Sequence, residues 1–474
     1  MAYSTINKST ANMSVKTYTG NGGSQSITGV GFQPDWSWIK KRNGAADSSL
    51  MDAVRGVRKS LTSNNNEAEY TESAGLSAFD SDGFSFDGSG YDHVNTNGDN
   101  FVAWNWKAGG TSPTKTYKVV VVSDSGNKYR FRNSTDTATF GSSAVTLDLQ
   151  EGGTYTFDVS DSTMNSHPFV IGTAANSTEY STGVTYKLDG VTKTYSQYTS
   201  GFSAATTRQL IFTVPASAPA LYYWCSVHSG MGGAINTNST FGSSNFDGTT
   251  QSVASANTTN GFSIVRYSGT GSQATIGHDL GVTPDVMIIR RTDGAEDWSV
   301  YHQYNGAGKY QALNTTEAQS SNNNRFNVAP TTSVFTVNTH SSVNHSGGTH
   351  IAYCFRNVPG YSSFGSYVGN GNASHGPFVN LGFRPSLVIV KNTSQTDSWF
   401  LNDDKRDGYN QDNEYLFTDL SNAEGTNVNR INFFSNGFKT ATADKSHNVS
   451  GNNYIYLAWG QPIVAGTNIP NNAR

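Results

Sequence analysis

Two segments of the chain contain the residue types that bind copper and zinc in proteins. Residues 165–171 carry His167 just before an apolar run, and residues 221–233 carry Cys225, His228 and Met231 at and after the end of another apolar run. Thiolate and imidazole are common ligands of both metals, and a thioether can add a weak further ligand to copper. These segments therefore supply the donors of a mononuclear metal site if the fold brings them together.

The apolar runs around these segments predict the strands that would carry the donors. Residues 118–122 form a valine-rich run, residues 154–159 alternate between apolar and polar, and residues 210–214 are mostly apolar. Short blocks of this kind, separated by Gly, Asn and Pro, are typical of β-strands joined by turns. In this pattern, and in its Cys-x-x-His-x-x-Met loop, the segment 113–236 resembles a cupredoxin.

The resemblance implies a ligand set and a cofactor. Cupredoxins take one histidine from an earlier strand or loop, which His167 matches, and the other ligands from the loop between the last two strands. Cys225, His228 and Met231 match those loop positions, with the methionine as the weak axial ligand of copper. Zinc at a distorted Cys/His₂ site is one alternative, and a loop that holds no metal is another.

A second candidate for chemistry is the acidic run that contains Glu67, Glu69 and Glu72. Residues two apart on a strand lie on one face, and glycoside hydrolysis needs two carboxyl groups about 5–10 Å apart. The run follows three asparagines and has no counterpart in the related segments described next. We expect a solvated acidic loop and no enzyme activity, and a glycan hydrolase is the least favoured alternative.

Outside the segment 113–236 the chain repeats one pattern three times. A Gly-x-x-Pro turn leads into an apolar strand that ends in a cation, at residues 31–40, 281–290 and 382–391. A strand phenylalanine and then a closing aromatic strand follow each time: Phe84 with 102–104, Phe335 with 351–353, and Phe438 with 457–459. The proline-to-phenylalanine spacings are 84−34 = 50, 335−284 = 51 and 438−385 = 53 residues. Strand signals at such intervals predict three two-sheet sandwiches.

The first copy has the fullest set of motifs, at residues 19–22, 32–40, 54–56, 79–84 and 103–110. This set resembles a concanavalin-like jelly-roll repeat of structural proteins of marine tailed phages. The resemblance implies a virion surface protein: either a tail fibre or adhesin that binds a host glycan or receptor, or a capsid decoration or fibre protein. Its partners would be other virion proteins and a host surface glycan, and the chain would be a homo-oligomer in the virion.

Composition and charge agree with that class and disfavour others. The net charge of −4 gives no electrostatic reason to expect a nucleic-acid partner. No stretch approaches the roughly 18–20 apolar residues that a membrane span needs. Residues 1–10 have no apolar core, so we expect no signal peptide. That expectation disfavours the remaining alternative, an extracellular copper protein of electron transfer.

The expected fold is all-β, with three jelly-roll sandwich repeats and one cupredoxin-like Greek-key sandwich. The expected boundaries are an N-terminal arm at 1–16, jelly-roll repeats at 17–112, 237–360 and 361–474, and the cupredoxin-like domain at 113–236.

Overall fold

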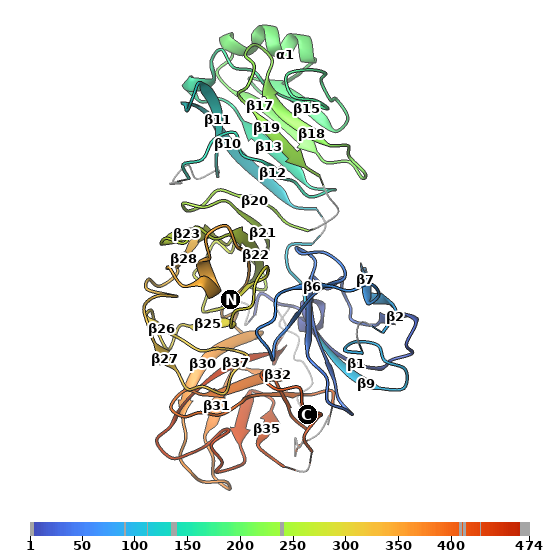
Figure 1. Ribbon diagram of the computed structural model, residues 1–474, viewed down its shortest axis with the longest axis vertical. Helices are drawn as coiled ribbons and strands as arrows, with labels where there is room; N and C mark the ends of the chain where they lie inside the picture. Colours follow the sequence, from blue (N-terminus) through green and yellow to red (C-terminus); the bar gives the residue numbers. More distant parts are fainter. Residues whose placement is uncertain are drawn as a thin grey trace. The chain divides into compact units, whose positions relative to one another are not determined.

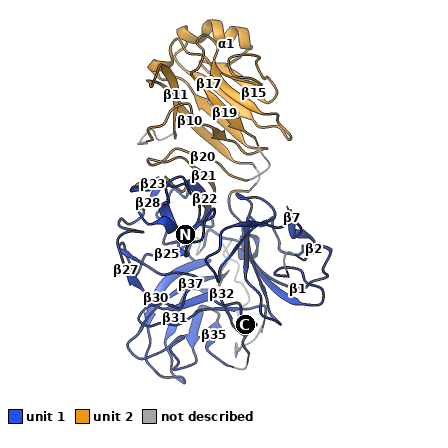
Figure 2. Cartoon of the chain, viewed as in Figure 1, with its two compact units in different colours: residues 1–108, 256–273, 280–474 blue, residues 109–255, 274–279 orange. Residues whose placement is uncertain are grey.

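The computed structural model divides into two compact units (Figure 2). It describes residues 4–89, 92–110, 112–133, 140–237, 241–406, 410, 414–426 and 428–464. Unit 1 comprises residues 1–108, 256–273 and 280–474, and unit 2 comprises residues 109–255 and 274–279. Strands hold 44% of the residues and helices 5%, which confirms the expected all-β fold.

Copy 1 of the repeat, residues 4–108, is a two-sheet sandwich (Figure 1). Its elements are η1 (Ser9–Ala11), β1 (Met13–Thr19), β2 (Ser24–Thr28), β3 (Trp36–Lys41), β4 (Ser49–Asp52), β5 (Lys59–Thr62), β6 (Tyr70–Thr71), β7 (Leu76–Asp80), β8 (Gly83–Asp87) and β9 (Asn100–Trp106). The larger sheet has the order β1-β9-β3-β4-β5-β6, and the smaller has the order β2-β8-β7. Ile39, Met51 and Ala103 of the larger sheet pack against Phe84 and Phe86 of the smaller one, because alternate strand residues point into the sandwich.

Copies 2 and 3 repeat this arrangement. In copy 2 the elements of unit 1 are β22 (Phe262–Ser268), β24 (Val286–Arg291), β25 (Ser299–His302), β26 (Lys309–Tyr310), β27 (Ser320–Ser321), β28 (Val334–Val337), α2 (Ser341–Asn344) and β29 (Thr349–Phe355). In copy 3 they are β30 (Ser362–Val368), β31 (Phe378–Asn380), β32 (Phe383–Asn392), β33 (Trp399–Asp403), β34 (Leu416–Phe417), β35 (Ile431–Phe434), β36 (Gly437–Thr440) and β37 (Asn453–Pro462). The orders β22-β29-β24-β25 and β30-β37-β32-β33 match β1-β9-β3-β4 of copy 1.

The closing strand of copy 3 is offset from the alignment expected from the sequence. Lys40 lies opposite Val102 in copy 1, whereas the equivalent Lys391 lies opposite Ile455 in copy 3. Residues 455–457, not 457–459, therefore correspond to residues 102–104. A register shift between Pro385 and Leu387 accompanies this difference. The offset is two residues, so the pattern of faces is preserved and the sequence alone does not reveal it.

The three copies of unit 1 close into a ring through equivalent main-chain hydrogen bonds. One loop of each copy donates a main-chain hydrogen bond to the copy before it, and copy 1 donates to copy 3. These bonds run from Ala46 N to Ser421 O, from Glu296 N to Asn66 O and from Asp397 N to Thr316 O, at 2.8–3.0 Å. Each copy also donates to the following copy: Glu69 N to Thr292 O, Gln319 N to Thr393 O, and Glu424 N to Arg42 O, at 2.7–3.0 Å. Every copy thus bonds both of the others in the same way, which gives the ring a pseudo-threefold arrangement. We call it the three-copy ring.

The cation that ends the apolar strand of each copy also takes part in the ring. Lys40 Nζ donates to the carbonyl oxygen of Leu420 in copy 3, Arg290 to that of Glu67 in copy 1, and Lys391 to that of Thr315 in copy 2. All three side chains are fully buried, and burial lowers the pKa of Lys40 to about 8. The cations seen in the sequence repeat therefore hold neighbouring copies together.

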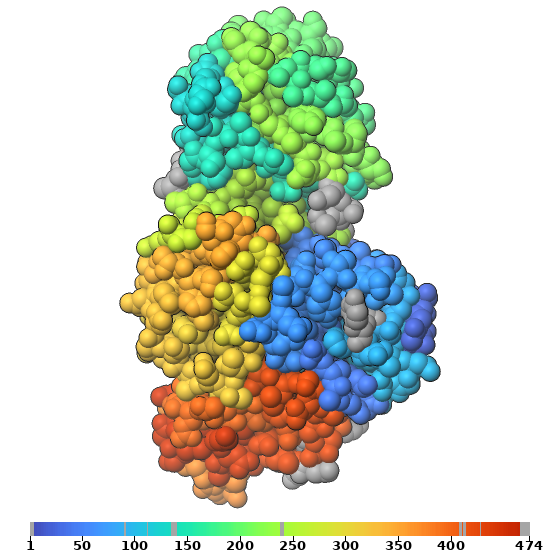
Figure 3. Space-filling model, viewed as in Figure 1, coloured from blue at the N-terminus to red at the C-terminus, as the bar shows by residue number. Residues whose placement is uncertain are grey.

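Aromatic side chains fill the centre of the ring. Trp106, Phe355 and Trp459 occupy equivalent positions on the closing strands, and their ring centroids are 5.2–6.4 Å apart. Trp36 of copy 1 stacks on Tyr353 of copy 2 at 4.3 Å. These side chains are at most 2% exposed, and the surfaces of the three copies meet in the space-filling view (Figure 3). Burial of this much aromatic surface is a large stabilising contribution.

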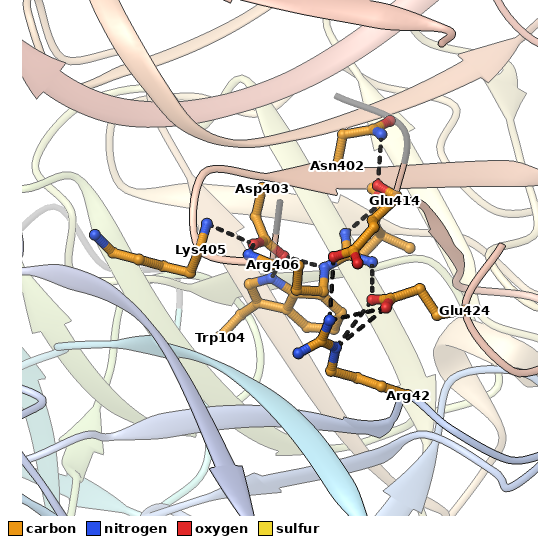
Figure 4. Close-up of polar contacts among 9 residues, drawn as sticks. Arg42, Trp104, Asn402, Asp403, Lys405, Arg406, Glu414 and Glu424 are labelled. Atoms are coloured by element: carbon orange, nitrogen blue, oxygen red, sulfur yellow. Dashed lines mark hydrogen bonds and ion pairs between the residues drawn. The ribbon is translucent and has the colours of Figure 1, made fainter. Parts of the chain in front are cut away.

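Buried polar groups complete the ring junctions. Between copies 3 and 1, Arg406 pairs with Asp403 at 2.7 Å and with Glu424 at 3.0 Å, and Arg42 reaches the same Glu424 at 2.9 Å (Figure 4). Trp104 of copy 1 donates its indole N–H to Asp403 at 3.0 Å.

The other two junctions use the residues equivalent to Asp403. Asp52 of copy 1 accepts a hydrogen bond from the Tyr353 hydroxyl of copy 2 at 2.8 Å. His302 of copy 2 lies 3.4 Å from the carbonyl oxygen of Tyr456 in copy 3. Asp52 and Asp403 each also pair with an arginine three residues later in the chain, Arg55 and Arg406. Copy 2 instead has the imidazole of His302 at this position, which is neutral because burial lowers its pKa to about 4.

Unit 2 is a second two-sheet sandwich. Its elements are β10 (Thr114–Ser123), β11 (Asn127–Asn133), β12 (Leu147–Asp148), β13 (Thr154–Asp158), η2 (Ser162–Met164), β14 (Phe169–Gly172), β15 (Val184–Leu188), β16 (Val191–Lys193), α1 (Tyr195–Gly201), η3 (Phe202–Ala204), β17 (Arg208–Thr213), β18 (Leu221–Cys225), β19 (Gly233–Asn236), β20 (Ser243–Asn245), β21 (Ser252–Asn257) and β23 (Ala274–Gly277). One sheet has the order β11-β10-β13-β17-β15-β16, and the other has the order β12-β19-β18-β14. The unit extends past residue 236 because Phe246 packs in its core against Phe131.

Candidate metal centre

The strands of unit 2 bring two of the predicted ligands to one end of a sheet. β14 pairs with β18 in antiparallel fashion, and Phe169 lies opposite Cys225. Cys225 is the last residue of β18, and His167 comes two residues before β14 begins. In an antiparallel pair the end of one strand lies beside the start of the next, so both side chains reach the same edge. His228 follows Cys225 in the turn that leaves β18.

The three donors lie close enough together to share one ion. Cys225 Sγ is 3.9 Å from His167 Nδ1 and 3.7 Å from His228 Nδ1. The ligand atoms of the three residues all lie within 4.8 Å of one another. An ion about 2.0–2.3 Å from each donor in a trigonal arrangement would hold the donors roughly 3.5–4 Å apart. The geometry therefore fits a mononuclear site with one thiolate and two imidazoles.

The environment of His167 favours the protonation state that binds metal. His167 is 8% exposed and Cys225 is 2% exposed, whereas His228 is exposed. Burial, with a smaller effect from the neighbouring His228, lowers the pKa of His167. A lower pKa keeps this imidazole neutral near pH 7, and only the neutral form is a ligand. The site is thus buried on the Cys225 side and open to solvent on the His228 side.

Hydrogen bonds to main-chain carbonyl oxygens hold the two ligand segments in place before any ion binds. The amide of His167 donates to Met164 O at 2.8 Å, and the Tyr129 hydroxyl donates to the carbonyl oxygen of His167 at 3.0 Å. The amide of Ser226, next to Cys225, donates to Pro168 O at 3.1 Å. Such preorganisation reduces the entropy that binding would cost.

The loop ends at Gly232, where only glycine fits. A Cβ atom at this position would lie 1.7 Å from the carbonyl oxygen of Tyr223. The close approach lets the chain turn back along β18 as β19. Met231, one residue earlier, is 1% exposed, and its carbonyl oxygen accepts from Tyr129 N. Its role as axial ligand stays a prediction.

The three carboxylates of the acidic run have separate environments. Glu67 is exposed. Glu69 pairs with Arg55 at 3.0 Å and with Lys59 at 3.7 Å. Glu72 is 1% exposed, and burial raises its pKa to about 7. The expectation of a wholly solvated loop is thus wrong for Glu72. The alternation of residues along a strand did not indicate that this side chain would be buried.

Comparison with known proteins gives one match. The model of a family described as a domain of unknown function (DUF7483) matches residues 8–218 and 234–462. A search of curated proteins and a search of solved structures each find no match. Among the described residues, no helix is long and apolar enough to cross a membrane.

Proposed function

Because the chain belongs to the DUF7483 family, whose function is unknown, its activity has to be argued from its own residues, and we propose that unit 2 binds one copper ion. The observation that carries this proposal is the convergence of His167, Cys225 and His228 within 4.8 Å at one edge of a β-sandwich. Two imidazoles and one thiolate are the equatorial donors of blue-copper sites. The resemblance of this segment to cupredoxins supports copper over zinc.

Reconstitution with Cu(II) tests the proposal directly. The intact chain should bind one copper per molecule and gain an intense visible absorption band from thiolate-to-copper charge transfer, with a narrow-hyperfine copper signal in electron paramagnetic resonance. Cys225→Ser should abolish the band because it removes the thiolate. Met231→Leu should retain the copper but shift the band if the thioether is an axial ligand.

Cys354 provides the matched control. It is the other cysteine of the chain, is fully buried in unit 1, and burial raises its pKa to about 12. Cys354→Ala should therefore leave the absorption band unchanged. A colourless protein that binds one zinc but no copper would replace the copper proposal with a zinc site. A protein that binds neither metal stoichiometrically would refute both.

Two uses of a bound copper are distinguishable. The exposed His228 gives the ion a short route to solvent, which supports electron exchange with a partner. Alternatively the ion only cross-links β14, β18 and their loop, because metal binding can contribute folding free energy. Reduction by a small-molecule donor with retention of the metal would support electron exchange. A copper that cannot be reduced without unfolding unit 2 would support the structural use.

For unit 1 we propose a structural role on the surface of a phage particle, in a tail fibre or adhesin or in a capsid decoration or fibre. The jelly-roll resemblance supports this role, and so does the three-copy ring, in which the buried arginines Arg55 and Arg406 pair with Asp52 and Asp403 and so stabilise the junctions between copies. Several chains would assemble on each virion, with other virion proteins and a host glycan as partners.

Immunogold labelling of purified phage particles with an antibody against the chain tests the location. Label on the tail supports the adhesin, and label over the head supports decoration. An unlabelled particle whose digest also lacks the chain would refute the virion proposal, and would leave the copper proposal unaffected.

A further inference from the structure

The repeated copies of unit 1 allow one buried arginine to be compared in two settings. In copy 3, Arg430 stacks over the ring of Tyr415 at 4.6 Å and donates to Ser446 Oγ at 2.9 Å. Its charge is balanced by Asp444, 3.1 Å away. The Asp444 side chain is 58% exposed and that of Arg430 is 14% exposed, so the counter-ion stands at the surface.

Copy 2 has an arginine at the same position. The carbonyl oxygen of Arg430 accepts from Ala441 N after the strand β36, and the carbonyl oxygen of Arg325 accepts from Asn338 N after the equivalent strand β28. Arg325 also lies over a tyrosine ring, that of Tyr310, at 3.8 Å. The two sites therefore share the arginine, the aromatic ring beneath it and the strand that follows.

The two sites differ in the residue at the position of the counter-ion. Asp444 O accepts from the amide of Asn448 at 2.9 Å, and His340 O accepts from the equivalent Asn344 at 2.8 Å, so His340 takes the place of Asp444. The Nδ1 atom of His340 accepts from Ser342 N at 3.1 Å. With Nδ1 as an acceptor the ring proton lies on Nε2, so copy 2 has an imidazole at the position where copy 3 has a carboxylate.

Arg325 is left buried without an acidic partner. It is 5% exposed, and within the described part of the chain no carboxylate reaches ion-pair distance from it. Its Nη1 donates to Ser299 Oγ at 2.8 Å, and its buried Nε has no partner, which is also true of Arg430. Besides Tyr310, the carboxylates of Asp297, Glu296 and Glu317 favour its charge only from farther away. A buried cation without an adjacent anion is costly unless an anion completes the site.

We propose that copy 2 binds a carboxylate-bearing ligand at Arg325, with the ligand's carboxylate beside the His340 ring, where it balances the arginine's charge as the Asp444 carboxylate does in copy 3. Arg325 supplies the charge and a directional donor, and His340 Nε2–H supplies a second donor. A guanidinium matches a planar carboxylate better than a lysine would, because it can bond both oxygens. The inference rests on the comparison of the copies and does not depend on the copper site or on the virion role.

Calorimetric titration of the intact chain with acetate, glucuronate and glucose tests the proposal. The first two carry a carboxylate and the third is neutral, so acetate and glucuronate should bind saturably with one site per chain and glucose should not. Equal affinities would identify the carboxylate alone as the ligand, and tighter glucuronate binding would identify an acidic sugar.

The decisive variant is His340→Asp, which supplies the carboxylate from the chain itself as copy 3 does. It should bind both carboxylates at least about tenfold more weakly than the native chain, which corresponds to about 1.4 kcal/mol, and should melt at a higher temperature. Arg430→Met in copy 3 is the matched control and should leave binding unchanged. Native affinity in His340→Asp, binding lost in Arg430→Met, or no saturable binding by the native chain would each overturn the proposal.

Discussion

Replacing Arg406 by methionine would open the three-copy ring at the junction of copies 3 and 1. The arginine side chain is 1% exposed and pairs with Asp403, which is fully buried, and with Glu424, which is 8% exposed. Methionine has a similar length but leaves both carboxylates buried without this partner. Breaking a buried pair in this way costs roughly 3–5 kcal/mol. Since Arg42 still reaches Glu424 at 2.9 Å, we expect about 3 kcal/mol.

Urea unfolding measures the loss, and hydrogen exchange shows how far it spreads. Because each copy bonds both of the others, exchange should accelerate in β24 and β25 of copy 2 as well as in β33 of copy 3. Arg384→Met is the control: Arg384 is 25% exposed and 4.0 Å from Asp404, so its loss should cost less than about 1 kcal/mol. A cost for Arg406→Met no larger than the control, or faster exchange confined to copy 3, would refute the closed ring.

Three further predictions concern single side chains. Burial lowers the pKa of His302 from 6.5 to about 4, so the unfolded chain takes up a proton first as pH falls. The free energy of unfolding should therefore fall by about 3 kcal/mol between pH 7 and pH 4. His302→Gln should remove that part of the fall in urea titrations at the two pH values, and an unchanged pH dependence would contradict the assignment. Glu72 has the opposite sign, because burial raises its pKa to about 7: Glu72→Gln should stabilise the protein by about 3 kcal/mol at pH 9 and hardly at pH 4, and an equal effect at both would show that the carboxyl is not buried. Gly232→Ala places a Cβ 1.7 Å from Tyr223 O, so it should weaken copper binding in a competition titration. Gly141→Ala is the control and should not, because no atom lies within 4 Å of the added Cβ.

The sequence was sufficient to predict the sandwiches because their landmarks are local. A proline lies within two residues of the start of each apolar strand, and Phe84, Phe335 and Phe438 are buried in three cores as their spacing indicates. Likewise the thiol and one imidazole of the candidate metal centre lie three residues apart, so a single loop reveals them. His167 came from the resemblance and from its place before an apolar run, and the pairing of β14 with β18 brings it to the same edge.

The ring and the Arg325 site could not be predicted in this way. The ring bonds join residues such as Ala46 and Ser421 through main-chain groups, which leave no mark in the sequence. The equivalence of Arg325 and Arg430 is also hidden, because the spacings differ by one residue. Arg325 lies 340−325 = 15 residues before His340, whereas Arg430 lies 444−430 = 14 residues before Asp444. Only the hydrogen-bonded framework places them at the same spot.

The three-copy ring makes in one polypeptide what three identical subunits would otherwise make. Identical subunits share every substitution, so an inserted domain would appear three times and an altered residue would change all sites together. With the copies joined in one reading frame, each position can change alone: copy 1 is followed by unit 2, copy 2 has His340 in place of an aspartate, and copy 3 keeps its own counter-ion. The chain therefore carries one copy of the unit 2 sandwich for every three copies of the repeat, a ratio that a homotrimer of single repeats could not encode.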